Sequence, residues 1–293
     1  MNLSIGFLNS EYNDAQSVLL HIPLPEIEHI QVPSQMMHLE KIKYSKIKKE
    51  FESIIECFQS NGIQVNLIPL NEQVSLTGKF FNLMYARDLL FLTPVGAIVS
   101  SMKFPVRYGE PSLAEETITK LDIPIIGKVT GDGTFEGADG LWLNPKLVII
   151  GVGGRTNDEG FRQVSEILQN QGVNTLKVEV PSTIQHLLGV MQFIDHDMVL
   201  LRSQLVSKEV IMILQEHGIT IIDVLESEEV TYKKAMNVVT IAPRTIVMPA
   251  DCPSTKRFYQ KHDISIVEVE ISELRKGAGG LGCATSILSR KLK

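Results

Sequence analysis

The sequence predicts an α/β fold of repeated units, because short β-rich runs alternate with amphipathic helical stretches along the whole chain. The clearest unit begins at Leu141, where two β-rich runs flank the Asn144-Pro145 turn. A helical stretch over 157–172 follows and ends at a glycine, and a third β-rich run covers 174–180. Each such unit therefore reads as strand, strand, helix, strand.

The same pattern returns in four other segments, over residues 16–70, 87–129, 197–224 and 237–271. Five units of roughly 50–60 residues each account for the length of the chain. One unit alone could not bury the apolar face of its strands, so we expect the units to close on one another in a single domain over 1–293. An ordinary open α/β sheet gives the same alternation, and periodicity does not separate the two folds.

The composition is that of a globular protein, with 293 residues, 44% of them hydrophobic, and a net charge of −6. It excludes disordered, collagen-like and coiled-coil classes. The acidic balance argues against nucleic acid or an anionic membrane as a partner, and no apolar stretch approaches the roughly 20 residues of a membrane span. Three cysteines do not make a disulfide framework, and the N-terminus lacks the basic head of a signal peptide. We therefore expect a cytoplasmic protein.

The sharpest local signal is the glycine-rich segment over 276–285, in which four glycines within six residues precede Cys283. Glycines let a backbone turn tightly and approach a ligand closely, and a thiol placed there is a nucleophile when nearby groups lower its pKa. A mobile tail with an inert cysteine is the alternative. Cys57 lies on the apolar side of a helical stretch and is expected in the core, whereas Cys252 has no evident role.

Other segments also carry chemistry-bearing residues. Glu136 and Asp139 lie among glycines in a segment that suits a cationic ligand, and Asp88 stands at the mouth of a predicted strand. His186 lies in a segment where Ser182 or Thr183 could cap a helix. The chain has no HExxH or paired CxxC motif, which makes a zinc site unexpected. The glycines near 151 lack the third member of a dinucleotide fingerprint.

Taken together, several segments resemble the guanidine-modifying enzymes of the pentein superfamily, which includes arginine deiminases, dimethylarginine dimethylaminohydrolases and amidinotransferases. The segments are LNSEYNDAQSVLLHIPLPEIEHI, NLMYARD, VRYGEP, GTFEGADG, GRTNDEGFRQV, QHLLGVMQFID, IVMPADCPSTK and GGLGCATS. The resemblance covers nearly the whole chain. It implies a five-bladed α/β propeller of repeated ββαβ units with pseudo-five-fold symmetry.

The resemblance also implies roles. Cys283 would attack the guanidinium carbon and form a covalent amidino-thioether, and His186 would protonate the departing amine and then activate water. Glu136 and Asp88 would hold the guanidinium, with Asp139 in the same acidic segment. The remaining substrate-binding residues would clamp the α-carboxylate or line the pocket: Arg107, Arg155, Asn82 and Tyr85. No cofactor and no metal are implied.

Two departures from the family pattern bear on the substrate. Arginine deiminases and amidinotransferases carry His-x-Asp, whereas here Leu188 follows two residues after His186, which leaves apolar room for N-alkyl groups. Arg87 before Asp88 resembles the deiminases instead. A loop over 9–13 is expected to close over the substrate, as such a loop often does in the family.

The sequence thus predicts a cysteine hydrolase of the guanidino group of arginine or N-methylated arginine, giving citrulline plus ammonia or a methylamine. An amidinotransferase and a dihydrolase that gives ornithine share the same intermediate and stay open. So does a binding protein like the ribosome anti-association factors, which share the propeller without the cysteine site. The expected partner is a small guanidino compound, and a homo-oligomer is left open.

Overall fold

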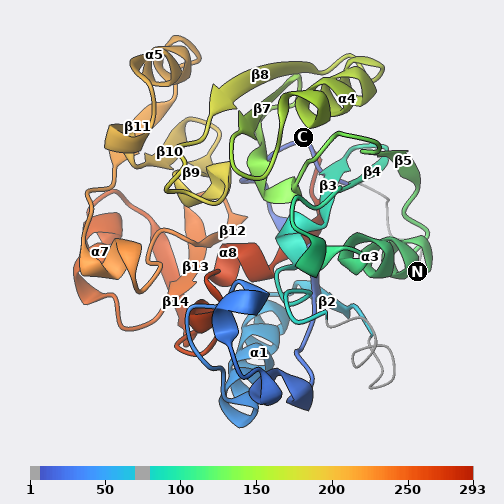
Figure 1. Cartoon of the computed structure of the whole chain (residues 1–293). Coiled ribbons are helices and arrows are strands. Elements are labelled where there is room, and N and C mark those ends of the chain that lie inside the picture. Colours follow the sequence, from blue (N-terminus) through green and yellow to red (C-terminus); the bar gives the residue numbers. More distant parts are fainter. Residues whose placement is uncertain (1–6, 70–79, 293) are drawn as a thin grey trace.

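The computed structural model describes residues 7–69 and 80–292, and these form a mixed α/β fold with five three-stranded sheets. Figure 1 shows the five units following one another in chain order around the centre of the molecule. The strands, in order of the units, are β1 (Ala15–Leu20) and β2 (Gln64–Leu67); β3 (Leu90–Thr93), β4 (Gly96–Val99) and β5 (Ile125–Lys128); β6 (Gly140–Asn144), β7 (Leu147–Val152) and β8 (Asn174–Glu179); β9 (Met191–Asp195), β10 (Met198–Leu201) and β11 (Thr220–Asp223); β12 (Val239–Ala242), β13 (Thr245–Pro249) and β14 (Ser265–Val269); and finally β15 (Ser286–Arg290).

Every sheet has the same internal order. In the second to fifth units the first strand pairs antiparallel with the second through a tight turn, and the second pairs parallel with the third. A parallel pair needs a crossover, and a helix supplies it in each unit. These helices are α1 (Tyr44–Ser60), α3 (Glu110–Thr119), α4 (Asp158–Gln169), α5 (Lys208–Glu216) and α7 (Pro253–Gln260). Figure 1 shows them at the periphery.

The first unit takes its antiparallel strand from the other end of the sequence. Its sheet has the order β15-β1-β2, with Val18 opposite Ile287. The segment after Cys283 is therefore a buried strand, and the alternative of a mobile tail is wrong.

The fourth unit differs from the sequence-based expectation. Its first strand is β9, whereas residues 203–205, expected in the second β-rich run, form a 3₁₀ turn. The segment around Ser182 and Thr183 does not begin an α-helix; residues 182–183 form a turn, and a 3₁₀ turn covers Leu187–Gly189. The apolar run VMQFI fits a helix or a fully buried strand equally well, and burial on both faces selects the strand.

Burial falls from the first strand of each unit to the third. Strands β3 and β9 are buried throughout, whereas β2 and β5 are largely exposed or half-buried. First strands of neighbouring units contact each other, as β9 does β12 and β3 does β15. In this inner layer the rings of Phe91 and Trp142 stack with their centroids 5.9 Å apart. A side chain at Gly140 would lie 2.6 Å from Phe91, so only glycine fits there.

Within the described residues, no helix combines the length and the apolar character needed to cross a bilayer.

Candidate active site

The chemistry-bearing residues come from five equivalent places in the fold. Each lies in the short segment just before the first strand of a unit: Asp88 before β3, Glu136 before β6, His186 before β9, Asn237 before β12 and Cys283 before β15. Four of the segments contain a single helical turn. Each of these turns contacts the next: Leu281–Ala284 contacts Ala86–Asp88, which contacts Gly137–Asp139, and this turn contacts Leu187–Gly189. Because the first strands are innermost, the segments before them converge on one site.

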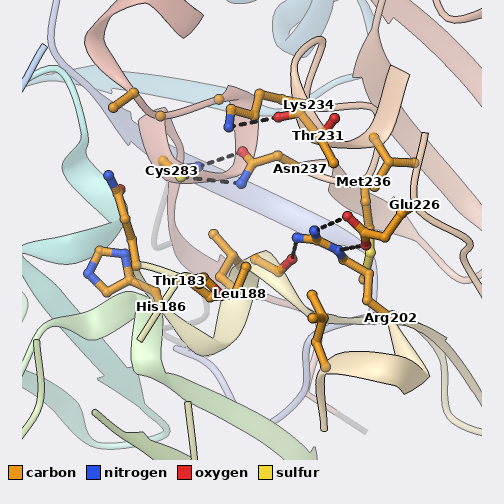
Figure 2. A pocket seen from close by; sticks show the side chains of 18 of the residues that line it. Thr183, His186, Leu188, Arg202, Glu226, Thr231, Lys234, Met236, Asn237 and Cys283 are labelled. Atoms are coloured by element: carbon orange, nitrogen blue, oxygen red, sulfur yellow. Dashed lines mark hydrogen bonds and ion pairs between the residues drawn. The ribbon is translucent and has the colours of Figure 1, made fainter. Parts of the chain in front are cut away.

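Cys283 is half-buried, and its thiol contacts an asparagine that sequence analysis did not single out. Asn237 Nδ2 donates to Cys283 Sγ at 3.2 Å, and the Cys283 N–H donates to Asn237 Oδ1 at 3.1 Å (Figure 2). Burial and the Asp88 carboxylate raise the pKa of the thiol, whereas hydrogen bonds from the Gly280 backbone and Asn237, and the Lys234 charge, lower it. The pair of hydrogen bonds fixes the orientation of the sulfur.

The glycine-rich segment serves contacts within the protein. A Cβ atom at Gly279 would lie 2.3 Å from the Tyr85 ring, and one at Gly280 would lie 2.7 Å from Asn237 Oδ1. The left-handed residue of the segment is Ala278, with φ of 75°. The glycines therefore let Tyr85 and Asn237 approach the backbone that carries Cys283.

His186 and Glu136 form a buried pair, with Nε2 and Oε2 2.7 Å apart. Burial lowers the pKa of His186, but the carboxylates of Asp88, Asp139 and Glu136 outweigh it and raise that pKa to about 9. Burial raises the pKa of Glu136, yet its hydrogen bond to His186 and the positive charges around it lower that pKa to about 2. The pair is thus an imidazolium and a carboxylate at neutral pH.

Arg107 lies at the centre of a cluster of buried carboxylates. Its guanidinium contacts Asp88 Oδ2 at 2.6 Å, Glu110 Oε2 at 2.8 Å and Glu136 Oε2 at 3.7 Å. Burial raises the pKa of Glu110 to about 7 in spite of Arg107. Burial also opposes the charged form of Arg107, but the three carboxylates raise its pKa above the ordinary range. In this structure the arginine predicted to clamp a carboxylate already holds three of the protein's own.

Arg155, the other arginine predicted to clamp the α-carboxylate, has fewer carboxylate partners than Arg107. Arg155 Nη1 lies 3.2 Å from Glu136 Oε2, and its guanidinium carbon lies 4.8 Å from the centre of the Phe104 ring. One carboxylate and one aromatic face hold this side chain in place.

Asn82 and Tyr85, the remaining pocket-lining residues, are both buried. Asn82 Oδ1 lies 3.2 Å from His38 Nε2, and burial lowers the pKa of His38 to about 4, so that histidine is neutral. The Tyr85 hydroxyl donates to the Leu274 carbonyl at 2.9 Å and accepts from the Gly279 N–H at 3.1 Å. These bonds tie the wall of the pocket to the glycine-rich segment.

Asp139 is buried beside the site, and its oxygens are occupied by the protein. Oδ2 accepts from the Thr156 hydroxyl at 2.6 Å, and Oδ1 accepts from the Leu187 N–H at 2.9 Å. Burial raises its pKa to about 6. The geometry favours a role in positioning the turn after His186 over the substrate contact that the sequence predicts.

The loop over 9–13, expected to close over a substrate, is packed against the interior. Glu11 is 9% exposed, pairs with Arg87 Nη2 at 3.4 Å and accepts from the Trp142 N–H at 3.1 Å. Arg87 Nη2 also donates to the Gly140 carbonyl at 3.0 Å. In this structure the loop is fixed, and Arg87 is engaged with Glu11 and β6.

Two cavities meet at Cys283. A narrow one of about 10 Å³ is lined by Asn82, Tyr85, Asp88, Arg107 and Arg155, whereas a wide one of about 450 Å³ is lined by His186 and Leu188, among others. Both include Cys283, Gln185 and Gly279 in their walls. Of the residues expected to bind substrate, all except Glu136 and Asp139 thus line the narrow cavity.

One polar atom of the narrow cavity has no hydrogen-bond partner among the described residues. Asp88 Oδ1 is buried, and His186 Nδ1 lies 3.8 Å from it, beyond hydrogen-bond distance. A buried carboxylate oxygen left in this state is costly unless it accepts a hydrogen bond from a ligand. Asp88 therefore marks the place where a donor, preferably a cation, fits.

Asp88, Glu136 and His186 also satisfy the spacing of a metal site, since their ligand atoms lie within 4.8 Å of one another. However, Arg107 contacts both carboxylates, and Arg155 contacts Glu136. Both carboxylates are thus already paired with guanidinium groups, planar cations that they bind through hydrogen bonds.

Comparisons with known proteins identify a family for the chain. The model of the family described as arginine deiminase matches residues 56–218 and 206–290. A dimethylarginine dimethylaminohydrolase from Pseudomonas aeruginosa is 27% identical over 246 residues, which is 84% of this chain and 90% of the relative.

Solved structures share the fold. A variant of the Pseudomonas aeruginosa dimethylarginine dimethylaminohydrolase in complex with citrulline superposes with a TM-score of 0.76, at 24% identity, covering 93% of this chain and 98% of that one. An amidinotransferase of saxitoxin biosynthesis from Microseira wollei gives 0.77 at 12% identity, covering 98% of each chain. With four-fifths of its sequence matched by the family model, the chain belongs to the arginine deiminase family, within the guanidine-modifying pentein superfamily.

Proposed function

We propose that the chain is a cysteine hydrolase of the guanidino group of arginine or an N-methylated arginine. The observation that carries the proposal is the Asp88 carboxylate, whose Oδ1 is buried and has no hydrogen-bond partner in the described part of the chain, in the same cavity that Cys283 lines. A planar guanidinium satisfies a carboxylate through paired N–H donors and brings its carbon near the thiol.

The Cys283 thiol, whose pKa is raised by burial and by the Asp88 carboxylate, first gives its proton to solvent. In the first half-reaction the resulting thiolate attacks the guanidinium carbon, and the bond from that carbon to the leaving nitrogen breaks. His186, protonated at neutral pH and facing the wide cavity, gives its proton to the departing amine. The product is a covalent amidino-thioether. Water then attacks the same carbon, His186 takes a proton, and the thiolate leaves, which gives citrulline when the substrate is an arginine.

Glu136 has a more specific role here than holding the substrate. Its Oε2 is 2.7 Å from His186 Nε2 and also meets Arg155, so little of the carboxylate is free for a ligand. It fixes the imidazole ring and stabilises its charged form, and Asp88 becomes the main carboxylate for the guanidinium. The substrate would displace the Arg107 guanidinium from Asp88 and leave Arg107 and Arg155 for the α-carboxylate.

The five sheets are, in this proposal, the blades of a single catalytic α/β propeller. The shared order within each sheet, the contacts between neighbouring first strands and the pairing of β1 with β15 support it. Such a ring explains why one residue from each of the five units reaches the same site.

Product analysis tests the reaction. Wild type, Cys283→Ser and Cys57→Ser are incubated with arginine, monomethylarginine and asymmetric dimethylarginine, and products and intact protein are measured by mass spectrometry. We expect citrulline and a transient amidino adduct on the protein from wild type and Cys57→Ser, and neither from Cys283→Ser. Citrulline from Cys283→Ser, or no turnover of any substrate by wild type, would reject the proposal.

The second candidate is an amidinotransferase, and the wide cavity favours it. About 450 Å³ beside Cys283 is more room than ammonia or methylamine needs, and an acceptor amine fits there. Transfer of the amidino group to an added amine in the same assay would identify this activity, and ornithine with two ammonia would identify a dihydrolase.

A further inference from the structure

The wide cavity carries a feature that simple hydrolysis of arginine does not use. It lies against Cys283 and His186, and part of the remaining wall is apolar, with Leu188 and Met236 (Figure 2). Asp88, Arg107 and Arg155 line the narrow cavity instead. A guanidinium held on Asp88 therefore directs its leaving nitrogen across Cys283 into the wide cavity, where His186, the proton donor, is found.

The volume of this cavity is larger than a small amine needs. Its volume of about 450 Å³ falls within the range of small-molecule sites, roughly 300–1,000 Å³, whereas one water occupies about 30 Å³ of liquid. Ammonia or methylamine would leave most of it filled with solvent. An amine with a chain of several carbon atoms would contact Leu188 and Met236.

Besides the His186 imidazolium, which pairs with Glu136, two cationic side chains border the cavity, and they differ in their partners. Arg202 donates from Nε and Nη2 to the two oxygens of Glu226, each at 2.6 Å, and from Nη1 to the Gly189 carbonyl at 3.0 Å. Its charge and its fork of donors are both engaged. Arg202 therefore adds no net charge to the cavity.

Lys234 is the cation left over. Within residues 7–69 and 80–292, its Nζ contacts no carboxylate and donates only to the Thr231 carbonyl, at 3.0 Å. The side chain is half-buried, and an ammonium has three donors, so two remain for a ligand. Figure 2 shows the ammonium on the side of the cavity where Cys283 and Asn237 lie.

The position of Lys234 is linked to that of the thiol. The Asn237 N–H donates to the Lys234 carbonyl at 2.8 Å, so one turn carries both the asparagine that contacts Cys283 Sγ and the lysine. Lys234 has a left-handed backbone with φ of 61°, a conformation that costs a lysine energy and recurs at functional sites. The turn thus holds a positive charge at a set place beside the reacting atoms.

We propose that the wide cavity is a subsite for the amine that leaves or joins the amidino carbon, and that Lys234 selects amines that carry a carboxylate. The inference rests on the proposed function and names its substrate class: a guanidino compound substituted on the leaving side by an acid-bearing chain, or an amino acid as acceptor. An amine of this kind places its nitrogen near His186, its carbon chain on Leu188 and Met236, and its carboxylate on Lys234.

Departure of an amine and attack by an amine involve the same groups: the amidino carbon, the Cys283 sulfur and His186. When the amine leaves, its bond to the amidino carbon breaks, the C–S bond to Cys283 has formed, and His186 supplies the proton. When the amine joins, its lone pair attacks the amidino carbon, the C–S bond breaks to regenerate the thiolate, and His186 accepts the proton. No oxidant, reductant or further reactant is required.

Binding can be measured without turnover. Calorimetric titration of Cys283→Ser with 4-aminobutyrate, 5-aminopentanoate, butylamine and pentylamine compares amines of equal length with and without the carboxylate. We expect the amino acids to bind at least roughly tenfold more tightly, because a partly desolvated ion pair of this kind is worth about one factor of ten. The added change Lys234→Met should abolish this preference, Lys234→Arg should retain it, and Lys233→Met should leave it unchanged. Lys233 is a matched control, since it already pairs with Asp251 at 2.8 Å.

Equal binding of amino acids and plain amines, binding of none of them, or a preference that survives Lys234→Met would overturn the subsite. Experiments with the cysteine present distinguish an amine that joins from one that leaves. Mass spectrometry follows transfer of the amidino group from arginine to each amine, and release of each amino acid from an arginine that carries it on the terminal nitrogen. Citrulline formation without any carboxylate preference would reject only the subsite. A carboxylate preference in Cys283→Ser with no guanidine processing by wild type would reject the proposed function and keep the binding site.

Discussion

The two sides of Cys283 differ in how their charges are arranged. On the narrow side the free space is only about 10 Å³, and Arg107, which lines it, contacts three carboxylates, those of Asp88, Glu110 and Glu136. On the wide side, about 450 Å³ is bordered by apolar groups, one neutralised arginine and Lys234. In the proposed function, the narrow side recognises a planar cation that replaces one already present, and the wide side admits amines of different length. On that proposal the narrow side determines the reaction class and the wide side the choice of amine.

The physical basis of this difference is desolvation. Buried charges are stable only when paired and hydrogen-bonded, so the narrow side is rigid and sensitive to the loss of any one member. The wide side keeps Lys234 half-exposed and costs little to rearrange. Substitutions on the narrow side should therefore affect activity and stability together, and those on the wide side should affect selectivity.

The largest expected effect comes from removing the proton donor at the boundary of the two sides. His186→Gln should lower the turnover of wild type by roughly 10²–10⁴-fold, the usual contribution of general acid–base catalysis, measured by citrulline formation under single-turnover conditions. His217→Gln, at the end of α5, is the control and should have no effect. A loss of less than tenfold in His186→Gln would remove this residue from the mechanism.

His186→Gln should also change how the free energy of unfolding depends on pH. Folding raises the pKa of His186 from 6.5 to about 9, so its contribution to the free energy of unfolding is complete below about pH 6.5 and is lost as the pH rises through about 9. Folding lowers the pKa of Glu136 from 4.5 to about 2, so its contribution is present above about pH 4.5 and is lost as the pH falls towards 2. The Tm difference between wild type and His186→Gln should be greatest at about pH 5–6 and shrink by about pH 9–10. A difference that grows with pH would contradict the ion pair.

Asp88→Asn tests the narrow side and should have the next largest effect. It removes a negative charge that raises the pKa of the Cys283 thiol, so alkylation by iodoacetamide should reach its half-maximal rate at a lower pH than in wild type. It also leaves Arg107 with two carboxylates instead of three, at a cost of about 1–3 kcal/mol in the free energy of unfolding. Affinity for arginine should fall. An unchanged alkylation profile would mean that Asp88 does not act on the thiol.

Asn237 tests the bonds that orient the sulfur. Asn237→Ala removes a donor to Sγ and should raise the thiol pKa, and Asn237→Asp should raise it further because a carboxylate replaces that donor. Both variants should slow alkylation at pH 7 severalfold to about tenfold. Asn170→Ala, at the end of α4, is the matched control. Faster alkylation in either Asn237 variant would contradict the hydrogen bond.

The smallest effect is expected on the wide side. Leu188→Ala widens the apolar wall, and we expect the ratio of turnover of dimethylarginine to arginine to change by roughly tenfold or less, since one or two methylene groups discriminate by about that amount. Leu143→Ala, buried in the same hydrophobic cluster, should cost similar stability without changing the ratio. Equal changes in both variants would assign the effect to loosened packing.

The sequence predicted the second, third and fifth units well, because each contains two β-rich runs around a local turn and one helix. The first unit could not be completed from local patterns, since β15 lies far away in the sequence from β1. In the fourth unit, the buried strand β9 lacks the alternation that identifies a half-buried strand.

The residues of the candidate site followed from the family resemblance, but the ion pairs and hydrogen bonds among them did not. Nothing in the sequence indicates that Arg107 holds three carboxylates, because such partners are set by side-chain packing across separate units. Asn237 and Lys234 were missed since an asparagine or lysine before a strand is common. The recurrent placement of site residues just before the first strand of a unit is the signal that would have found Asn237.

The pairing of β1 with β15 has a consequence for how the protein forms. Ser17 and Ser289 are in hydrogen-bond contact at 2.8 Å although 272 residues separate them. Contacts of such long range are slow to form, and at about 5–20 residues per second the ribosome releases the last strand many seconds after the first. Until β15 is made, residues 15–20 lack their antiparallel partner, and an unpaired strand edge can pair with other chains. Since Cys283 precedes β15 directly, the thiol enters its final surroundings only at the last step of folding.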